Sequence, residues 1–506
     1  MLLTGASGSM GFEAFKELWK RRDRCDIVLL LLPNKLEKRL FRPYEKDVGI
    51  RSISGNGVVQ SAEGGLKIVW GDLTEYEDVR EAVRGVDHVL HPAALISPAA
   101  DHNPALARRV NYGGAENLIK AIKAEPQGAE RITLVSIGSV AFYGDRLPPI
   151  ALIRAGDPLM PSVFDFYAIS KIAAEREVVE SGIRRWVSMR QTYIAIPDVR
   201  SLMDPIMFHQ PLEQRIEMCT ARDAGYGLVR TLDQPLDSDF WRRVYNQTGG
   251  PSARFVYMDY LERMMKILGL GDYRKLMDRN WFTLRNFHCA WYADSHILNG
   301  YLGHQRDSYE DHLRQVEDAL PGYIKLGKIV PKSLIKKLVM RPMASRKDGP
   351  LYWITHPDQM PNRIKAFYSS ADEWSRMGDW SSVDADSCSN LRILDHGYDE
   401  SKSVDDLSIE ELRKAAVFRG GECLSSEYCG DRSEKLSWRC AFGHEFEASV
   451  ALVLLAGHWC PECSPPPWDY ARIARKNPFL AQAYYNTHSP DESHCYLEEE
   501  CLKEVF

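Results

Sequence analysis

Three glycines at the start of the chain constrain its fold more than any other feature. The first eleven residues read MLLTGASGSMG, so Gly5, Gly8 and Gly11 stand three apart directly after an apolar start, and a helical run follows from residue 12 to 19. A glycine turn between a strand and a helix N-terminus forms a phosphate cradle. The first glycine permits the tight turn, the second lets the backbone approach a pyrophosphate, and the third lets helix and strand pack closely.

Strand-like and helix-like segments alternate through the first half of the chain. Buried strands are expected over residues 27–32, 66–70, 86–91 and 132–136, and helices over 12–22, 76–84, 104–124 and 164–180. This alternation predicts an α/β fold with a doubly wound parallel sheet. In such a fold, ligands bind at the carboxyl ends of the strands.

A tyrosine and a lysine four residues apart form the second candidate site. Tyr167 and Lys171 fall in the expected helix over 164–180 and therefore project from one helix face. A free tyrosine has a pKa of about 10, and a nearby ammonium lowers it, so the pair can act as an acid/base near neutral pH. Ser139 ends the preceding strand and can hydrogen-bond a substrate oxygen. Taken alone, Tyr167 and Lys171 are better explained as an ordinary surface pair on a helix.

The order of five motifs resembles a known family. T-G-x-x-G-x-x-G at 4–11, G-D-L-T at 71–74, N-Y-G-G at 111–114, a serine before Y-G at 143–144, and Y-x-x-x-K at 167–171 follow one another. Together they resemble the extended short-chain dehydrogenase/reductases, the NAD-dependent epimerase/dehydratase superfamily, over roughly residues 1–300. The resemblance implies a Ser139, Tyr167 and Lys171 triad, with Ser136 as the alternative serine, and a lysine that also bonds the nicotinamide ribose.

The same resemblance implies the cofactor contacts and one departure. Besides Tyr167 and Lys171, the implied contacts are Gly5, Ser7, Gly8, Met10, Gly11, Lys35, Asp72, Leu73, Ala93 and Ala94. Asn111 matches a helix asparagine with a mainly structural role. Where the family has R-P-x-x-V-Y-G, residues 190–194 read RQTYI and lack the proline, which leaves the nicotinamide-side loop without a direct counterpart.

Cofactor choice is expected at the end of the second strand. An acid there would bind the ribose 2′-hydroxyl of NAD, and a basic residue would accept the 2′-phosphate of NADP. Residues 32–35 read LPNK, with no acid at the strand end and with Lys38 and Arg39 close behind Lys35. This pattern favours NADP, with NAD as the alternative.

Four regions are expected along the chain. They are a Rossmann domain (1–195), a substrate-binding part (196–325), a basic helical segment with an acidic linker at 372–386 (326–400), and a zinc-binding module (401–506). Residues 325–347 hold eight Lys or Arg and no acid, and 331–341 predict a basic amphipathic helix. Such a helix can lie on an anionic membrane or pack on its own domain. No apolar run is long enough to span a membrane.

Two ligand pairs near the C-terminus predict a structural zinc site. C-x-x-x-H at Cys440 and His444 and C-x-x-C at Cys460 and Cys463 are fifteen residues apart and resemble a treble-clef or zinc-ribbon module, with His458 as a substitute ligand. Four protein ligands would close the site. Residues 401–506 carry 11 Lys and Arg against 18 Asp and Glu, which argues against nucleic acid. Eleven cysteines fit metal ligation in a reducing cytoplasm.

These observations predict an NAD(P)-dependent oxidoreductase that acts on a small alcohol or ketone, such as an apolar, steroid-like one. Two alternatives remain: a nucleotide-sugar epimerase with the same triad, and a non-catalytic NADP-sensing scaffold. A 4,6-dehydratase is disfavoured, because that branch has acidic residues where this chain has Val140 and Ala141. The sequence does not predict an oligomeric state.

Overall fold

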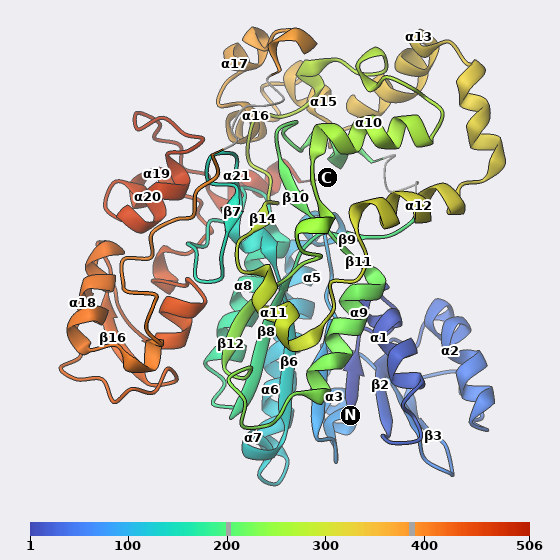
Figure 1. Cartoon of the computed structure of the whole chain (residues 1–506), viewed down its shortest axis with the longest axis vertical. Coiled ribbons are helices and arrows are strands. Elements are labelled where there is room, and N and C mark those ends of the chain that lie inside the picture. The colour runs from blue at the N-terminus through green and yellow to red at the C-terminus, as the bar shows by residue number, and fades with distance from the viewer. Residues whose placement is uncertain (199–203, 384–389, 506) are drawn as a thin grey trace.

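A computed structural model describes residues 1–198, 204–383 and 390–505, and an eight-stranded sheet forms its centre (Figure 1). Seven strands run parallel and the edge strand β3 is antiparallel. In spatial order the strands are β12 (Arg243–Gln247), β8 (Arg185–Gln191), β6 (Thr133–Ser139), β5 (His88–His91), β1 (Leu2–Thr4), β2 (Ile27–Leu31), β4 (Leu66–Trp70) and β3 (Gly57–Gln60). The strand β12 comes from the segment that was expected to bind substrate.

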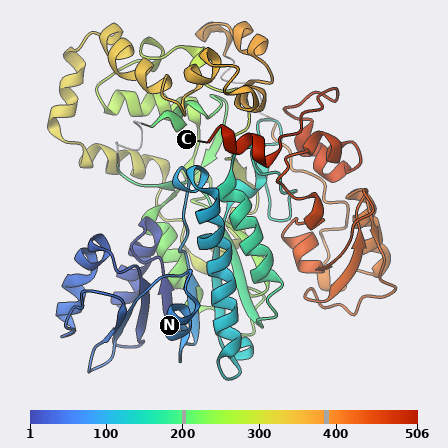
Figure 2. The same cartoon turned by 180° about the vertical axis from the view of Figure 1, so that it is seen from behind.

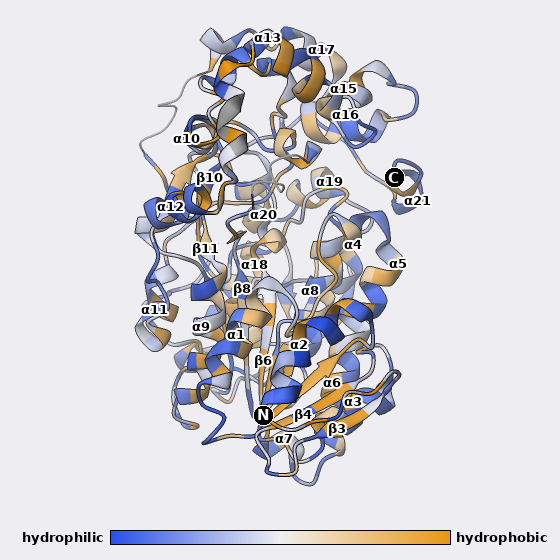
Figure 3. Cartoon of the chain, turned by 90° about the vertical axis from the view of Figure 1, so that its right-hand side faces the viewer, coloured by the Kyte–Doolittle hydropathy of each residue, from blue (hydrophilic) through white to orange (hydrophobic). Residues whose placement is uncertain are grey.

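Helices cover both faces of this sheet. One face carries α3 (Tyr76–Val83), α6 (Gly114–Ala124) and α8 (Phe166–Val179). The other face carries α1 (Ser9–Trp19), α2 (Lys35–Asp47), α9 (Ala221–Arg230) and α11 (Ser295–Leu302). Strands buried on both sides read as continuous apolar runs, as LLT in β1 and IVLLL in β2 do. In Figure 3 the strands near the N-terminus are accordingly coloured as hydrophobic. The doubly wound α/β fold is therefore confirmed.

The helix expected over 104–124 is interrupted by a wider turn. It consists of α5 (Pro104–Ala107), the π-helical segment η1 (Arg108–Gly113) and α6. Short α4 (Ala99–His102) precedes it and α7 (Gly128–Arg131) follows it. A π-helical turn inserts one extra residue per turn and frequently marks a functional site. Here the turn carries Asn111 and contacts α8.

A second lobe lies above the carboxyl ends of the strands (Figure 1). Its own apolar cluster is rich in methionine and aromatic residues. Its main elements are β10 (Arg215–Glu217), β13 (Arg254–Val256), α10 (Tyr257–Ile267), α12 (Tyr309–Ala319), α13 (Lys332–Ile335), η10 (Lys336–Met340) and α14 (Arg341–Ala344). Short parallel pairs join the lobes: β7 (Leu152–Ile153) with β14 (Trp291–Tyr292), and β9 (Ile194–Ala195) with β11 (Cys219–Thr220).

The basic amphipathic segment packs on this lobe with one of its faces. Ile335, Met340 and Met343 are buried in the methionine-rich cluster. On the opposite side, Leu334 is 45% exposed and Leu338 is 61% exposed. No helix among the described residues is long and apolar enough to cross a membrane.

The rest of the chain has two parts: its first helices lie with the second lobe, and most of the segment from residue 390 onward lies beside the edge of the sheet that carries β12 (Figures 1 and 2). Its elements are α15 (Pro350–Thr355), α16 (Pro361–Tyr368), α17 (Ala371–Arg376), α18 (Ile409–Phe418), β15 (Glu422–Cys423), β16 (Lys435–Arg439), β17 (Glu445–Ser449), the π-helical η13 (Ala451–Leu455), α19 (Tyr470–Ala474), α20 (Pro478–Tyr484) and α21 (Glu498–Lys503). The expected linker begins as α17, and residues 384–386 of it lie outside the described residues. The Glu504 carboxylate accepts the backbone N–H groups of Asn362 and Arg363, which ties the C-terminus to α16.

Candidate active site

The glycine turn has the geometry of a phosphate cradle. Gly5 follows β1 with a φ of +60°, and a Cβ on it would lie 2.7 Å from the Ala93 Cα atom. A Cβ on Gly11 would lie 2.0 Å from the Gly5 carbonyl oxygen. Gly8 is exposed, and a Cβ on it would lie 3.5 Å from that same oxygen, in ordinary contact. The fold itself therefore requires glycine at positions 5 and 11, whereas glycine at position 8 leaves room for a ligand above the α1 N-terminus.

The other predicted cofactor contacts surround this turn. Ala93 and Ala94 follow β5, and Ala93 packs on Gly5. Asp72 follows β4 and accepts hydrogen bonds from the Thr74 N–H (2.8 Å) and hydroxyl (3.0 Å). Leu73 is buried and packs against Gly114 of α6. Met10 is 5% exposed, and its side chain belongs to the apolar core that α1 packs into, directly after the glycine turn.

The expectation that no acid stands at the end of the second strand is wrong. Glu37 lies in the first turn of α2, and its carboxylate accepts the Leu32 N–H at 3.1 Å, directly after β2. The Ser7 hydroxyl in the glycine turn lies near enough to this carboxylate to lower its pKa. Burial raises the pKa of Glu37. A signal for this was present in the sequence, because Asn34 caps α2 and an acid three residues after an N-cap reaches back toward the strand.

The basic residues near this acid point elsewhere or into solvent. Lys38 donates to the carbonyl oxygens of Ile53 (2.9 Å) and Gly55 (3.1 Å) and lies over the Trp70 ring. Lys35 and Arg39 are exposed at the start of α2. Glu37 is therefore the charged group that lies between the strand end and the glycine turn.

The helix α8 carries both Tyr167 and Lys171 beside the end of β6. Asp165 caps its N-terminus by accepting the Ala168 N–H at 2.8 Å. Phe164, one residue earlier, holds a φ of +73°, a backbone conformation that bulky residues rarely adopt. Ser139 ends β6, and its hydroxyl lies near enough to the Tyr167 hydroxyl to lower the pKa of that phenol. Lys171 follows on the same helix, which packs on β6, so these two neighbouring elements carry the three residues of the predicted triad.

The electrostatics of Tyr167 differ from the expectation. Its pKa is raised to about 12, first by burial and then by the carboxylates of Asp165 and Asp101, while the Ser139 hydrogen bond lowers it. The lowering expected from Lys171 does not prevail. Asp101 accepts the Tyr167 N–H at 3.1 Å, and its own pKa is raised to about 7 by burial and by Asp165. At neutral pH, Tyr167 is therefore a protonated phenol.

Lys171 lies between two titratable groups that the sequence analysis did not identify. Burial lowers its pKa to about 8, and Glu175, one helical turn further along α8, opposes that shift. On β5, His91 has a pKa lowered to about 3 by burial and by Lys171, so it is neutral. Its Nδ1 lies 2.8 Å from the Thr4 hydroxyl, at the end of β1.

Asn111 has the structural role expected of it. Its side-chain oxygen accepts the Leu95 N–H at 2.7 Å, and its amide donates to the Leu95 carbonyl (2.9 Å) and the Ser170 hydroxyl (2.9 Å). It therefore fixes the turn that contains Ala93 and Ala94 against the helix that carries Tyr167.

Residues 190–194, where the family proline is missing, begin with an arginine that forms a buried ion pair. Arg190, at the end of β8, pairs with Glu175 of α8 at 2.5 Å, and both side chains are at most 1% exposed. Arg190 also donates to the Tyr143 hydroxyl at 2.8 Å and to the Ala456 carbonyl at 2.6 Å. This arginine thus links α8 to the C-terminal region.

Four side chains of the C-terminal region converge on one point. Cys440 and His444 lie in the turn between β16 and β17, and Cys460 and Cys463 follow η13. Their ligand atoms all lie within 4.8 Å of one another. The His444 Nδ1 atom is 3.4–3.5 Å from the three sulfurs, and the Cys440 and Cys463 sulfurs are 3.8 Å apart.

These distances fit a tetrahedral ion. Bonds of about 2.3 Å to sulfur and about 2.1 Å to nitrogen place two sulfurs about 3.8 Å apart and a sulfur and a nitrogen about 3.6 Å apart. Gly443 and Gly457 hold the turns at φ values of +84° and +70°. His458, expected as a substitute ligand, instead lies 3.0 Å from Glu175.

Comparison with known proteins agrees with this geometry for the N-terminal part. The family model described as NAD dependent epimerase/dehydratase family matches residues 1–190 and supports placing this part of the chain in that family. The 3 beta-hydroxysteroid dehydrogenase/Delta 5-->4-isomerase of Mycobacterium tuberculosis is 30% identical over 143 residues, which are 26% of this chain and 36% of that protein. A UDP-glucose 4-epimerase of Rickettsia akari is 32% identical over 123 residues, 24% of this chain and 32% of that protein.

This chain thus matches about a third of the length of these curated relatives. Among solved structures, the UDP-Glc/GlcNAc 4-epimerase of Campylobacter jejuni has a TM-score of 0.47 at 15% identity, covering 63% of this chain and 97% of that one. The dTDP-glucose 4,6-dehydratase of Bacillus anthracis in complex with NAD has a TM-score of 0.46 at 15% identity, covering 63% and 94%.

Proposed function

We propose that this protein is an NAD-dependent oxidoreductase that moves a hydride between the nicotinamide and the carbinol or carbonyl carbon of a small alcohol or ketone. The observation that carries the proposal is the joint position of Ser139, Tyr167 and Lys171 at the same end of the sheet as the glycine cradle. A dinucleotide bound across that end would place its nicotinamide half toward α8.

The protonation state of the triad supports proton donation. The nicotinamide cofactor would supply the hydride chemistry when bound. Ser139 orients the substrate oxygen and Tyr167, protonated at neutral pH, donates its proton to that oxygen as the carbonyl is reduced. In the direction of alcohol oxidation, Tyr167 must first release a proton, which its raised pKa opposes. We therefore propose carbonyl reduction as the direction that the unliganded electrostatics favour.

The same geometry supports NAD over NADP. The Glu37 carboxylate between the strand end and Ser7 is placed to accept ribose hydroxyls and would repel a 2′-phosphate. Cys440, His444, Cys460 and Cys463 would hold one structural zinc ion in a site closed by four protein ligands.

An epimerase uses the same triad and remains the second candidate, because one group of relatives is named UDP-glucose 4-epimerase. The two functions differ in cofactor turnover. A dehydrogenase or reductase consumes added NADH or NAD in proportion to product, whereas an epimerase returns its hydride to the same substrate. A cofactor-binding scaffold would do neither.

The test is a titration of NAD and NADP into the purified protein, followed by a screen of ketones with NADH at the nicotinamide absorbance band. The Tyr167→Phe variant should bind NAD normally and lose about 100-fold or more in turnover, since a positioned acid/base contributes on that scale. Tyr112→Phe, on the neighbouring η1 segment, is the matched control and should retain activity. Near-normal turnover by Tyr167→Phe would refute the triad.

A further inference from the structure

The loop between η13 and the second ligand pair, residues 456–460, docks on the catalytic helix α8. His458 Nε2 lies 3.0 Å from a Glu175 carboxylate oxygen, and the Trp459 carbonyl accepts a hydrogen bond from Arg176 at 2.8 Å. A Cβ on Gly457 would lie 2.1 Å from the Asp157 carbonyl oxygen. The loop backbone therefore lies directly against the catalytic domain, and we call residues 456–460 the docking loop.

The docking loop completes the environment of one carboxylate. Glu175 is 2% exposed, and its oxygens accept hydrogen bonds from Ser188 (2.6 Å) and Arg190 (3.1 and 2.5 Å) besides the His458 contact. Burial by itself would raise the pKa of Glu175, but Arg190 and His458 lower it to about 2. An uncompensated buried charge is strongly destabilising, so each of these partners helps to hold the ionised Glu175 carboxylate in its buried position.

Glu175 in turn acts on Lys171. The two residues are four apart on α8 and share one helix face. Of the charged groups that affect Lys171, Glu175 favours its ammonium form, and burial opposes it. On the same helix face, Tyr167 lies one turn before Lys171, and His91 of β5 is a further titratable neighbour, which is neutral. The charge of Lys171 therefore depends on an ionised and correctly placed Glu175.

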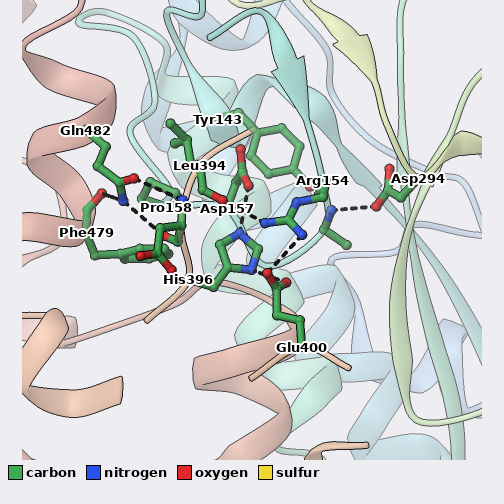
Figure 4. A network of polar contacts seen from close by, with 12 residues as sticks. Tyr143, Arg154, Asp157, Pro158, Asp294, Leu394, His396, Glu400, Phe479 and Gln482 are labelled. Carbon is green, nitrogen blue, oxygen red and sulfur yellow. Dashed lines mark hydrogen bonds and ion pairs between the residues drawn. The ribbon is translucent and has the colours of Figure 1, made fainter. Parts of the chain in front are cut away.

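A second buried contact joins the same two parts of the protein. Figure 4 shows the His396 ring between Asp157 and Glu400, at 2.8 Å from each, with Arg154 on the Glu400 carboxylate at 2.9 Å. His396 and Asp157 are each 1% exposed. This contact reaches the segment that follows the catalytic serine strand, so the C-terminal region touches the active-site scaffold on two sides.

We propose that the docking loop is a positioning element of the active site: through His458 it holds the Glu175 carboxylate, which lies one helical turn from Lys171 on the same face of α8. The C-terminal module is thereby part of the catalytic apparatus and not an independent appendage. The proposal rests on the proposed function for the role of Lys171, but the contacts and their effect on this amine are measurable without any substrate.

A metal ion held by Cys440, His444, Cys460 and Cys463 would make this loop more rigid. Cys460 is the last residue of the docking loop and lies two residues after His458. Metal bound by Cys460 and Cys463 would fix one end of the loop, and η13, which contacts α8 and β12, fixes the other. We therefore expect loss of the metal to loosen α8 as well as the C-terminal module.

The test is NMR of protein made with lysine labelled with carbon-13 at Cε, from pH 6 to 10. The Lys171 signal, assigned by its absence from a Lys171→Met variant, reports the titration of this buried amine. Glu175→Gln should move the Lys171 midpoint down by about one pH unit, and His458→Leu should move it in the same direction by less. His458→Gln, which keeps a donor, should restore the wild-type midpoint. His488→Leu, which removes another partly buried C-terminal histidine that stacks on Tyr484, should not change it.

A second measurement keeps the proposal falsifiable if a variant does not fold. Hydrogen exchange of the wild-type protein, with and without a zinc chelator, should show faster exchange in the α8 peptide on chelation and no change in the α2 peptide. An unshifted Lys171 midpoint in folded His458→Leu, or an α8 peptide protected equally in both states, would overturn the proposal. Failure of NAD to bind would instead overturn only the proposed function, since neither readout uses the cofactor.

Discussion

Substitution of two glycines in the cradle by alanine should separate folding from cofactor binding. At Gly11 the new Cβ would lie 2.0 Å from the Gly5 carbonyl oxygen and 2.8 Å from its carbon. Both atoms belong to the backbone, so the turn itself must move by more than 1 Å to reach an ordinary contact of about 3.4–4 Å. Overpacking of this kind costs about 1–3 kcal/mol. For a domain of about 200 residues, this corresponds to a fall in melting temperature of about 2–12 °C.

At Gly8 the change to alanine should weaken cofactor binding and have only a small effect on stability. The Cβ would lie at an ordinary 3.5 Å from the Gly5 oxygen, and the residue has a φ of −74°, which alanine adopts freely. Alanine is a poorer N-cap than glycine and costs about 0.5–1 kcal/mol. However, its methyl group would occupy the surface where the pyrophosphate approaches, so the Kd for NAD should rise about tenfold or more, which is 1.4 kcal/mol.

Thermal unfolding and NAD titration of both variants check these expectations together. Gly300→Ala is the matched control, because Gly300 lies in α11 with open space around its Cα atom. This variant should lower neither the melting temperature nor the affinity for NAD. Wild-type NAD affinity in Gly8→Ala would refute the cradle. An unchanged melting temperature in Gly11→Ala would refute the steric argument for the α1 packing.

Four further outcomes are expected. The wild-type protein should bind NAD more tightly than NADP, and Glu37→Gln should remove most of that difference in a titration; a wild-type preference for NADP would contradict the role of this acid. The purified protein should contain about one zinc ion per chain, and the Cys460→Ser variant should lose it. The control variant Cys429→Ser, at an exposed position outside the cluster, should retain the zinc. Equal zinc content in the two variants would contradict the site. Burial alone would raise the pKa of Glu175, but its ion-pair partners lower it to about 2. The contribution of this carboxylate to stability should therefore be complete above about pH 4.5 and disappear as the pH falls toward 2. Glu175→Gln should flatten this part of an acid-unfolding profile. Finally, we propose that the exposed Leu338, which lies among basic residues, contacts anionic membranes. The protein should sediment with phosphatidylserine vesicles, and the Leu338→Glu variant should not. Equal sedimentation of the wild-type protein and the variant would exclude this contact.

Much of the site was predictable because its elements are local. The glycine turn depends on backbone conformations within eleven residues, and Tyr167 and Lys171 share a helix face through their spacing alone. The two zinc-ligand pairs are likewise turns of four or five residues, so their spacing indicated a cluster that the structure brings together. Alternating apolar segments predicted the doubly wound sheet, since strands buried on both faces need continuous apolar runs.

Tertiary structure alone decided which charged groups surround these motifs. His458 is 283 residues from Glu175 in the chain, and spacing near the cysteines marked it only as a spare ligand. The pKa of Tyr167 is raised and not lowered, because burial and two carboxylates act on it. Glu37 faces the cradle because a helix N-terminus folds back onto a strand end. Electrostatic effects depend on distance and burial in three dimensions, and neither quantity is contained in the spacing of residues along the chain.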